Sequence, residues 1–460
     1  MKIKRNKNLL FREYDDFGYL INTETLSETI ISKSACALFR FLTDEQQDFR
    51  VVLDKLYDFF SIAEQDKKSV ADDFYELLEE LNGGLFFDIE DASESNNAES
   101  FALNTKNRSE SYNSRESKQA IKDMPSQFYD GTFIITEDCN NRCLHCYNSY
   151  TTRKPCYMSK EVFDKGLKNC IDSGAVRIDI SGGEALIHPD IEYFLSAVKE
   201  TGLRFRLYSN GQNITKRICS IMRDMRLSPV SVTLYSINPE VHDSITQNKG
   251  SWANTVKGLR LFKEYGIPFQ VSVPITKKNI DDFEKLFDFC EKDLGAVAVG
   301  PNPFISFTVN HGKTNQEIIP TLADMRLFAE RYAEYAAVRG YSILPTRKEK
   351  PAAYKLYNNG FYGSLTFLPD GSIVAGTLMP DLVLGNVAKD DIKTLWKNSP
   401  LMNEWRGYTI SMLKDCDGCP CRDYCKPSIG DNWVANHDLL KCDKHFCDMN
   451  KVYYDVLTKR

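Results

Sequence analysis

The sequence contains no long hydrophobic run. Among its 460 residues, no segment approaches the roughly 18 consecutive apolar residues that span a bilayer. The first residues, MKIKRNKNLLFREYDD, contain no apolar core that leads to a small-residue cleavage site. From these absences we expect a cytoplasmic chain that does not enter a membrane.

An excess of positive charge is also absent. Lysine and arginine number 58 against 64 aspartates and glutamates, so the formal net charge is -6. A chain with this balance has no overall basic field that attracts nucleic acid or an anionic membrane surface. We therefore expect neither as a partner.

Cysteines are few for this length, 14 in 460 residues, whereas a disulfide scaffold needs a much higher share. Most of them are clustered within residues 139–146 and 416–447, which favours metal binding. The remaining five stand in ordinary stretches, where a cysteine usually packs as a small hydrophobic residue. These are Cys36, Cys156, Cys170, Cys219 and Cys290.

The first 90 residues are predicted to form a winged-helix-like domain of three strands followed by three helices and a last strand. Apolar runs at 9–11, 19–21 and 29–31 indicate the strands. The third helix is the clearest, with Ser69 as its cap, an apolar stripe from 70 to 81, and Gly83 and Gly84 as its stop. Ser34 is the predicted cap of the first helix.

Residues 91–125 are predicted to be a flexible linker. The stretch 91–119 contains seven serines and only three large apolar residues, too few to offset the entropy of ordering the chain.

From 126 to 310 strands and helices alternate, and six strand candidates are present. Repeated βα units give parallel strands with right-handed crossovers, which means a doubly wound sheet or a full or partial barrel. Six repeats favour a partial (βα)6 TIM-type barrel over 126–310, within the α/β class. A bridging region over 311–360 and a cysteine-rich domain over 361–460 follow.

Three cysteines, Cys139, Cys143 and Cys146, directly follow the first strand of the predicted barrel at the spacing C-x3-C-x2-C. Three thiolates at this spacing can hold three irons of a [4Fe-4S] cube and leave the fourth iron open. The alternatives are a zinc site or buried free thiols. Zinc sites usually pair such cysteines with a second pair, and His145 is the one obvious further ligand nearby.

Small or acidic residues follow the next three strands, at the edge of a barrel where active sites are built. Glycines permit close backbone approach to a ligand, a carboxylate suits an ammonium group, and small polar side chains suit ribose hydroxyls. The predicted cofactor-binding residues are Gly182, Gly183, Glu184, Ser209, Asn210 and Ser236.

With these residues the sequence resembles the radical S-adenosylmethionine (radical SAM) superfamily. The resemblance implies that the open iron binds the amino and carboxylate groups of SAM, and that SAM cleavage yields a 5'-deoxyadenosyl radical that abstracts hydrogen. It also implies that Glu184 binds the SAM amino group, with Asn210 and Ser236 near the ribose.

The C-terminal cysteines are similar to the SPASM extension of peptide-modifying radical SAM enzymes. The resemblance assigns four ligands of one auxiliary [4Fe-4S] cluster, namely Cys416, Cys419, Cys425 and Cys447. No cysteine lies between Cys290 and Cys416, and Ile429 stands where the family has another, so only two clusters are expected in total. Cys421 and Cys442 are extra to the pattern, and a zinc ribbon is the alternative.

The order of elements in residues 1–90 resembles the PqqD-like recognition element, which captures a leader peptide as an added strand. A DNA-binding winged helix is the alternative. Its recognition helix would repel phosphate groups here because it carries Asp72, Asp73, Glu76, Glu79 and Glu80.

Together these features predict a radical SAM/SPASM enzyme that installs an intrapeptide crosslink, a thioether or a carbon–carbon bond, in a ribosomally made precursor peptide. An external electron donor of the flavodoxin or ferredoxin type is expected. The alternatives are a peptide epimerase and a non-catalytic iron–sulfur redox or peptide-binding protein. No residue is singled out as the catalytic base.

Overall fold

The computed structural model describes residues 1–14, 17–22, 28–82, 86–90, 128–146, 156–302, 317–341, 343, 356, 363–425 and 427–459. It contains two compact units, Met1–Ser126 and Gln127–Arg460, which are described separately. The predicted linker at 91–125 and the predicted helix stop at Gly83 and Gly84 lie outside the described residues. Within the described residues, no helix has the length and apolar character needed to cross a bilayer.

The first unit contains two small antiparallel sheets. The three predicted strands form one of them in the order β2–β3–β4, with bounds Leu9–Glu13, Phe17–Asn22 and Glu28–Ser32. The second has the order β5–β1–β6, with bounds Gln47–Asp48, Lys2–Arg5 and Phe87–Glu90. Strand β1 was not predicted because its sequence, KIKR, has one apolar residue, Ile3, which is fully buried.

Three helices follow β4 as predicted: α1 at Cys36–Phe41, α2 at Phe49–Phe60 and α3 at Lys67–Asn82. Both predicted caps are wrong. Helix α1 begins after Ala35, and α3 continues directly from a 3-10 turn at Glu64–Asp66, so Ser69 lies inside the helix. The helices pack on the strands through a core that includes Leu20, Leu38, Leu56 and Leu78, each with no exposed surface.

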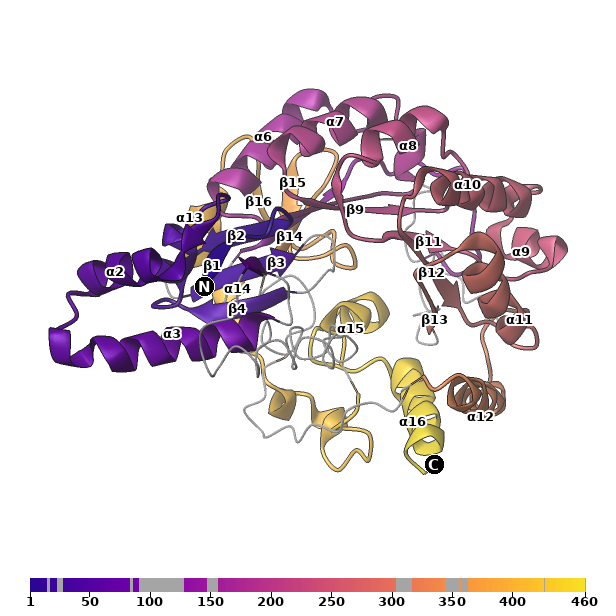
Figure 1. The fold of residues 1–460 in the computed structure, drawn as a ribbon. Coiled ribbons are helices and arrows are strands. Elements are labelled where there is room, and N and C mark those ends of the chain that lie inside the picture. The colour runs from indigo at the N-terminus through magenta and orange to yellow at the C-terminus, as the bar shows by residue number, and fades with distance from the viewer. Residues whose placement is uncertain are drawn as a thin grey trace. The chain divides into compact units, whose positions relative to one another are not determined.

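The second unit is built on one ten-stranded mixed sheet (Figure 1). In the part of the chain that the structure describes, six of its strands are parallel neighbours in sequence order. A doubly wound sheet reverses its strand order at a switch point, whereas a barrel wall does not. The strands are β7 (Asp130–Ile134), β8 (Arg177–Ser181), β9 (Arg204–Ser209), β11 (Val230–Thr233), β12 (Phe269–Pro274) and β13 (Ala298–Asn302).

Helices line one face of these strands along the outer side of the sheet in Figure 1. They are α6 (Lys160–Asp172), α7 (Ile191–Thr201), α8 (Lys216–Met222), α9 (Pro239–Thr246), α10 (Ser251–Tyr265) and α11 (Phe283–Asp288), and α11 continues as a π-helical turn, Phe289–Leu294. Short strand β10 (Arg226–Leu227) pairs with β9. Helix α12 (Leu322–Val338) packs against α16 (Lys444–Thr458).

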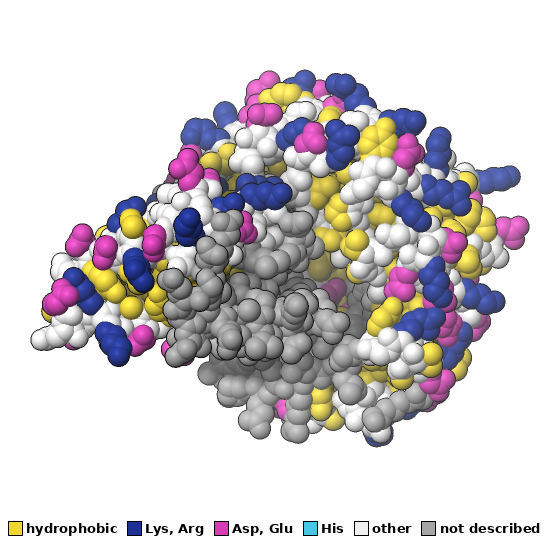
Figure 2. Space-filling view, in the orientation of Figure 1, with side chains coloured by type: hydrophobic (Ala, Val, Ile, Leu, Met, Phe, Trp, Pro, Cys, Tyr) yellow, Lys and Arg dark blue, Asp and Glu magenta, His cyan; other side chains and the backbone are white. Residues whose placement is uncertain are grey.

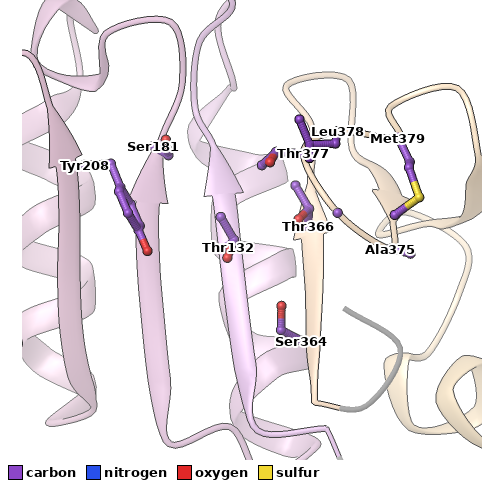
Figure 3. Close-up of a pocket in the computed structure, with 10 residues that line it drawn as sticks. Thr132, Ser181, Tyr208, Ser364, Thr366, Ala375, Thr377, Leu378 and Met379 are labelled. Carbon is purple, nitrogen blue, oxygen red and sulfur yellow. The ribbon is translucent and has the colours of Figure 1, made fainter. Parts of the chain in front are cut away.

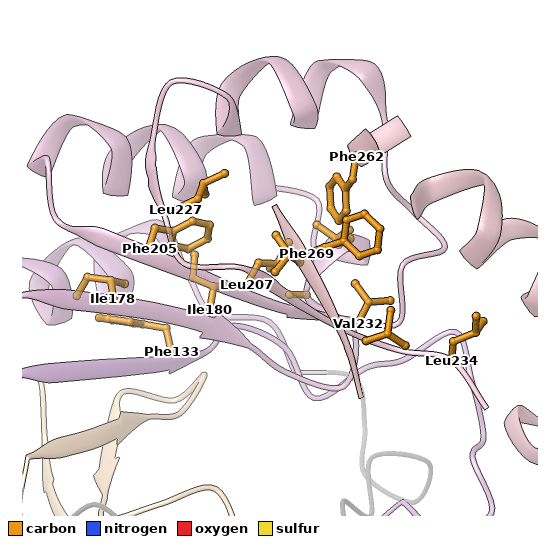
Figure 4. Close-up of a cluster of buried hydrophobic side chains, with 14 of the residues drawn as sticks. Phe133, Ile178, Ile180, Phe205, Leu207, Leu227, Val232, Leu234, Phe262 and Phe269 are labelled. Atoms are coloured by element: carbon orange, nitrogen blue, oxygen red, sulfur yellow. The ribbon is translucent and has the colours of Figure 1, made fainter. Parts of the chain in front are cut away.

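The two faces of the parallel strands differ in chemistry. Apolar side chains on alternate positions point to the helices, as Figure 4 shows for Phe133, Ile178, Ile180, Phe205 and Leu207. The intervening positions carry polar groups that share the opposite face across the strands. In register they are Thr132, Asp179 and Arg206, with Ser181 and Tyr208 nearer the carboxyl ends. A parallel sheet that is buried on both faces is apolar on both faces. The polar side chains on the face opposite the helices therefore indicate that this face lines an interior space.

The C-terminal segment also contributes to this sheet, which the sequence did not predict. Strand β14 (Ser364–Phe367) pairs parallel to β7, and β15 (Ser372–Val374) and β16 (Val383–Asn386) follow antiparallel. Residues of the predicted cysteine-rich domain also form α13 (Ile392–Asn398), α14 (Pro400–Arg406), α15 (Ile429–Asn436) and α16. The sheet therefore joins residues that the sequence assigned to separate domains.

Phe205 tests the packing of helices on the sheet because its side chain is fully buried between them. Phe205→Ala should lower the free energy of unfolding by about 3–5 kcal/mol, since a large side chain is lost and a cavity remains. Ile171→Ala, at a position 43% exposed on α6, is the control and should cost less than about 1 kcal/mol. Urea unfolding followed by circular dichroism measures both, and equal costs would contradict this description of the core.

Candidate functional site

The three cysteines lie on a loop that is fixed between β7 and α9. The backbone N–H groups of Arg142 and Leu144 donate to the carbonyls of Thr246 and Ile245, at 2.9 and 3.0 Å. Both carbonyls belong to the last turn of α9, where helical carbonyls lack partners within the helix. The loop therefore satisfies the end of α9 and is held at the carboxyl edge of the sheet.

The glycine pair after β8 packs directly on the start of this loop. Gly183 N–H donates to the Thr136 carbonyl at 2.9 Å, and Glu184 N–H donates to the Asp138 carbonyl at 2.8 Å. A Cβ atom at Gly183 would lie 2.2 Å from the Asp138 carbonyl oxygen, and one at Gly182 would lie 2.6 Å from that of Thr136. Only glycine fits at either position, so the pair has a structural role beside the predicted approach to a ligand.

The thiols of Cys139 and Cys143 receive hydrogen bonds. Asn141 N–H donates to Cys139 Sγ at 3.4 Å, and the Tyr235 hydroxyl donates to Cys143 Sγ at 3.6 Å. Burial raises the pKa of both thiols to about 12, and the neighbouring thiols add to this effect. Deprotonation of such thiols needs a compensating positive charge, which a metal cluster supplies.

The three thiols on this loop are donors of the kind that an iron–sulfur cube uses. A tetrahedral zinc, with bonds of about 2.3 Å, would draw its sulfurs together around one centre, whereas a cube places each thiolate on a different iron. Hydrogen bonds to the sulfurs are also usual around such clusters.

Glu184 lies at the centre of the polar groups at this edge. Its side chain is buried; Oε1 accepts from Leu186 N–H at 3.0 Å and from the Ser209 hydroxyl at 2.8 Å, and Oε2 accepts from Asn210 N–H at 2.6 Å. Burial raises the pKa of Glu184. The structure thus joins three predicted residues, Glu184, Ser209 and Asn210, and the carboxylate retains acceptor capacity on Oε2.

Ser236, the cofactor-binding residue predicted after the fourth strand, belongs to a hydrogen-bond network separate from that of Glu184. Its fully buried hydroxyl donates to Asp282 Oδ2 at 2.6 Å and accepts from Asn238 N–H at 2.9 Å. Burial raises the pKa of Asp282. A role of Ser236 near ribose therefore stays a prediction, because its proton is already used within the protein.

Amide side chains connect the third strand's loop to the cysteine loop, and Asn210 is the one among them that the sequence predicted as a site residue. Asn210 Nδ2 donates to Asn140 Oδ1 at 2.6 Å, and Gln212 Nε2 donates to Asn141 Oδ1 at 2.7 Å. Asn248 Nδ2 also donates to Asn141 Oδ1, at 2.9 Å. These bonds hold Asn210 beside the cysteine loop.

A cavity of about 300 Å³ opens on the polar face of the sheet (Figure 3). Hydroxyl groups dominate its wall, and the loop after β15 closes the other side. It is lined by Thr132, Ser181, Tyr208, Ser364, Thr366, Ala375, Gly376, Thr377, Leu378 and Met379. Ser181 and Tyr208 immediately precede Gly182 and Ser209, so the cavity adjoins the strand ends that carry the predicted cofactor residues.

Charged residues on the same face are paired with one another. Asp179 is buried, with Oδ1 3.1 Å from Arg177 Nε and Oδ2 3.7 Å from Arg206 Nε. Arg206 Nη1 in turn donates to the Tyr208 hydroxyl oxygen at 3.1 Å. The carboxylate of Asp179 is thus paired with two guanidinium groups.

The C-terminal cysteines form contacts that involve both extra residues. Hydrogen bonds with Cys416 and Cys447 raise the pKa of the Cys442 thiol, so these three thiols lie together. Burial, with an added contribution from Cys419, raises the pKa of Cys421 to about 11. The assignment of Cys416, Cys419, Cys425 and Cys447 stays a prediction, and Cys421 and Cys442 lie beside members of that set.

Four of the five cysteines expected to pack as small hydrophobic residues are fully buried: Cys36, Cys170, Cys219 and Cys290. Cys156 is half-buried. This prediction is confirmed for the four.

Comparison with known families gives one match, the radical SAM superfamily, over residues 133–290. The chain is 29% identical over 306 residues to the antilisterial bacteriocin subtilosin biosynthesis protein AlbA of Bacillus subtilis, covering 64% of this chain and 65% of that protein. It is 25% identical over 338 residues to the AdoMet-dependent heme synthase of Methanosarcina barkeri, covering 68% of this chain and 94% of that enzyme.

Among solved structures, the fold is similar to Streptococcus suis SuiB bound to its precursor peptide SuiA. The TM-score is 0.66 at 16% identity, and the alignment covers 97% of this chain and 100% of that one. At this identity the similarity concerns the fold.

Glu184→Gln tests the polar centre of the site. The carboxylate oxygens of Glu184 accept three hydrogen bonds, and the amide would replace one of these oxygens with an NH2 group. The NH2 group would then face at least one of the present donors and could not accept its hydrogen bond. The free energy of unfolding should fall by about 1–3 kcal/mol, the cost of leaving a buried polar group unsatisfied. Glu200→Gln, at an exposed position, should leave it unchanged in the same urea titration. Equal stability of the two variants would show that Glu184 is not held as described.

Proposed function

Because residues 133–290 form a radical SAM domain, we propose that this chain is a radical SAM enzyme that modifies a ribosomally made precursor peptide. One observation carries the proposal: the three-cysteine loop is packed on Gly182 and Gly183, with Glu184 immediately behind it.

In this proposal Cys139, Cys143 and Cys146 hold three irons of a [4Fe-4S] cluster, and the fourth iron is open to SAM. Together the cluster and SAM supply hydrogen-atom abstraction. Glu184 Oε2, which already accepts from Asn210 N–H, would accept from the SAM amino group. The amide network around Asn140 and Asn210 fixes the neighbouring loops, so that the cofactor enters a preformed edge.

The first unit would bind the leader segment of the peptide. Within the described residues, β4 pairs with β3 alone, so one edge of the β2–β3–β4 sheet is open to an added strand. Strand addition draws its affinity from backbone hydrogen bonds, and flanking pockets supply specificity. On the face that Figure 2 shows, Lys and Arg are interspersed with Asp and Glu. That face therefore shows no large patch of one charge sign that would favour charge-driven binding over strand addition.

The names of two relatives support a peptide substrate. AlbA is named for bacteriocin biosynthesis, and SuiB was crystallised with a precursor peptide. The SuiB fold covers 97% of this chain and therefore extends over both compact units.

A heme-synthase type of reaction is the second candidate, favoured by the Methanosarcina barkeri relative. Its match covers 68% of this chain and the match to AlbA covers 64%, so coverage alone does not separate the two candidates. A substrate of that type has no leader segment for the first unit to bind. The two candidates therefore differ in whether residues 1–90 are needed for substrate binding.

A crosslink is the proposed product because of electron accounting. Bond formation after hydrogen abstraction removes two electrons from the peptide, and an auxiliary cluster in the C-terminal segment can accept the second. Epimerisation is redox neutral and needs a hydrogen donor, often a thiol, for which Cys421 and Cys442 are the candidates. The external electron donor, of the flavodoxin or ferredoxin type, stays a prediction.

The first test replaces Cys139, Cys143 and Cys146 by Ala together. Iron content should fall from about two clusters to about one, and formation of 5'-deoxyadenosine from SAM should be lost, because the reactive cluster has no remaining ligands. Iron analysis and liquid chromatography measure the two quantities. Cys156→Ala, a cysteine outside both clusters, is the control. Retained 5'-deoxyadenosine formation in the triple variant would refute the ligand assignment.

A second test deletes residues 1–90. Binding of the precursor peptide, identified from a short reading frame beside the gene, should weaken at least tenfold, while SAM cleavage without peptide should persist. Fluorescence anisotropy with a labelled peptide measures the dissociation constant. Equal affinity with and without these residues would exclude the recognition role and favour the second candidate.

The third test distinguishes crosslinking from epimerisation by mass spectrometry of the treated peptide. A crosslinked product is lighter by two hydrogens, because one new bond replaces two bonds to hydrogen. A reaction run in deuterated water would instead add one deuterium to an epimer. Deuterium at an alpha carbon without loss of two hydrogens would decide for the epimerase.

A further inference from the structure

Tyr235 is a buried residue two positions beyond the end of β11, and hydrogen bonds hold both its backbone N–H and its backbone carbonyl. Its N–H donates to His242 Nδ1 at 3.3 Å, and its carbonyl accepts from Asn279 Nδ2 at 2.8 Å. The residue is 4% exposed. Its ring therefore has little freedom, and its hydroxyl is held at the cysteine loop.

The Tyr235 hydroxyl has two partners on that loop. Its oxygen lies 3.6 Å from Cys143 Sγ and 2.7 Å from His145 Nε2. An iron-bound thiolate carries no proton, so in the Cys143 pair the tyrosine must be the donor. The tyrosine has one proton, so if that proton points to sulfur, His145 Nε2–H must donate to the tyrosine oxygen.

We propose that Tyr235 tunes the reduction potential of the reactive cluster through a relay of two hydrogen bonds, from His145 Nε2–H to the Tyr235 oxygen and from Tyr235 O–H to Cys143 Sγ. The inference rests on the proposed function, since it requires Cys143 as an iron ligand. Tyr235 is a positioning residue: it acts on the iron through the sulfur of Cys143.

The direction of the effect follows from charge. Reduction adds one negative charge to the cluster and its thiolates. A hydrogen bond donated to a thiolate is stronger when that charge is greater, so the bond favours the reduced state and raises the potential. The donor from His145 polarises the tyrosine hydroxyl and reinforces the bond.

A competing arrangement uses the same atoms with the opposite proton order. A neutral imidazole carries one ring N–H, on Nδ1 or on Nε2. If that proton is on Nδ1, Nε2 accepts the tyrosine proton and Cys143 loses it. The two arrangements predict opposite effects for removal of the imidazole.

The experiment uses the full chain, with its clusters reconstituted anaerobically, as wild type, Tyr235→Phe and His145→Leu. The probe is the electron paramagnetic resonance signal of the reduced cluster that changes on addition of SAM, followed through a potentiometric titration. Tyr335→Phe is the matched control, because it removes a buried hydroxyl that donates to Asp288 and has no cysteine partner.

Tyr235→Phe should shift the ratio of reduced to oxidised cluster about tenfold toward the oxidised form at a given potential, a fall in midpoint potential of about 59 mV for one electron. His145→Leu should give a smaller fall, and Tyr335→Phe should give none. An unchanged potential in Tyr235→Phe would overturn the proposal.

If Tyr235→Phe does not retain the cluster, the midpoint potential of His145→Leu decides between the two proton arrangements. A potential above that of the wild type would establish the competing arrangement, because loss of the imidazole would then free the tyrosine proton for Cys143. A wild-type protein without any SAM-sensitive signal would overturn the proposed function and this inference together, whereas an unchanged potential removes only the inference.

Discussion

The site depends on one close contact, between the glycine pair after β8 and the first residues of the cysteine loop. The Asp138 carbonyl lies where a Cβ atom at Gly183 would stand, and Glu184 N–H donates to that carbonyl. This contact sets the distance between the loop that carries the thiols and the carboxylate that collects three hydrogen bonds. Helix α9 holds the other side of the same loop through Thr246 and Ile245. The loop is thus positioned by elements that the sheet itself places in order.

The sheet serves the site by having two unlike faces. Phe133, Ile180 and Phe205 pack under the helices, which leaves the opposite face free for Thr132, Ser181 and Tyr208 to line a cavity. Charged groups deeper on that face neutralise one another, as Asp179 does between Arg177 and Arg206. A hydroxyl-lined space with paired charges beside it can accept a polar segment of a substrate without leaving an isolated buried charge.

Sequence patterns within short stretches predicted the features that depend on neighbouring residues. The alternation of strands and helices identified the six parallel strands, and the spacing of Cys139, Cys143 and Cys146 identified the loop, because both signals lie within short stretches of sequence. Strand β14 was missed because its partner, β7, precedes it by more than 200 residues. Neither the alternation of strands and helices nor the cysteine spacing predicts a pairing between segments so far apart. Tyr235 and Asn248 were missed for the same reason, since they meet the cysteine loop only in the folded chain. Ser69 was wrong as the predicted cap of α3, because a 3-10 turn leads directly into this helix before Ser69.

The central claim is that Cys139, Cys143 and Cys146 hold a cluster that cleaves SAM. Its most direct test is anaerobic incubation of the reconstituted wild-type chain with SAM and dithionite, with 5'-deoxyadenosine measured over time by liquid chromatography and mass spectrometry. We expect formation of 5'-deoxyadenosine that requires both the reductant and the iron. A protein that carries the reduced cluster and binds SAM, yet forms no 5'-deoxyadenosine, would contradict it.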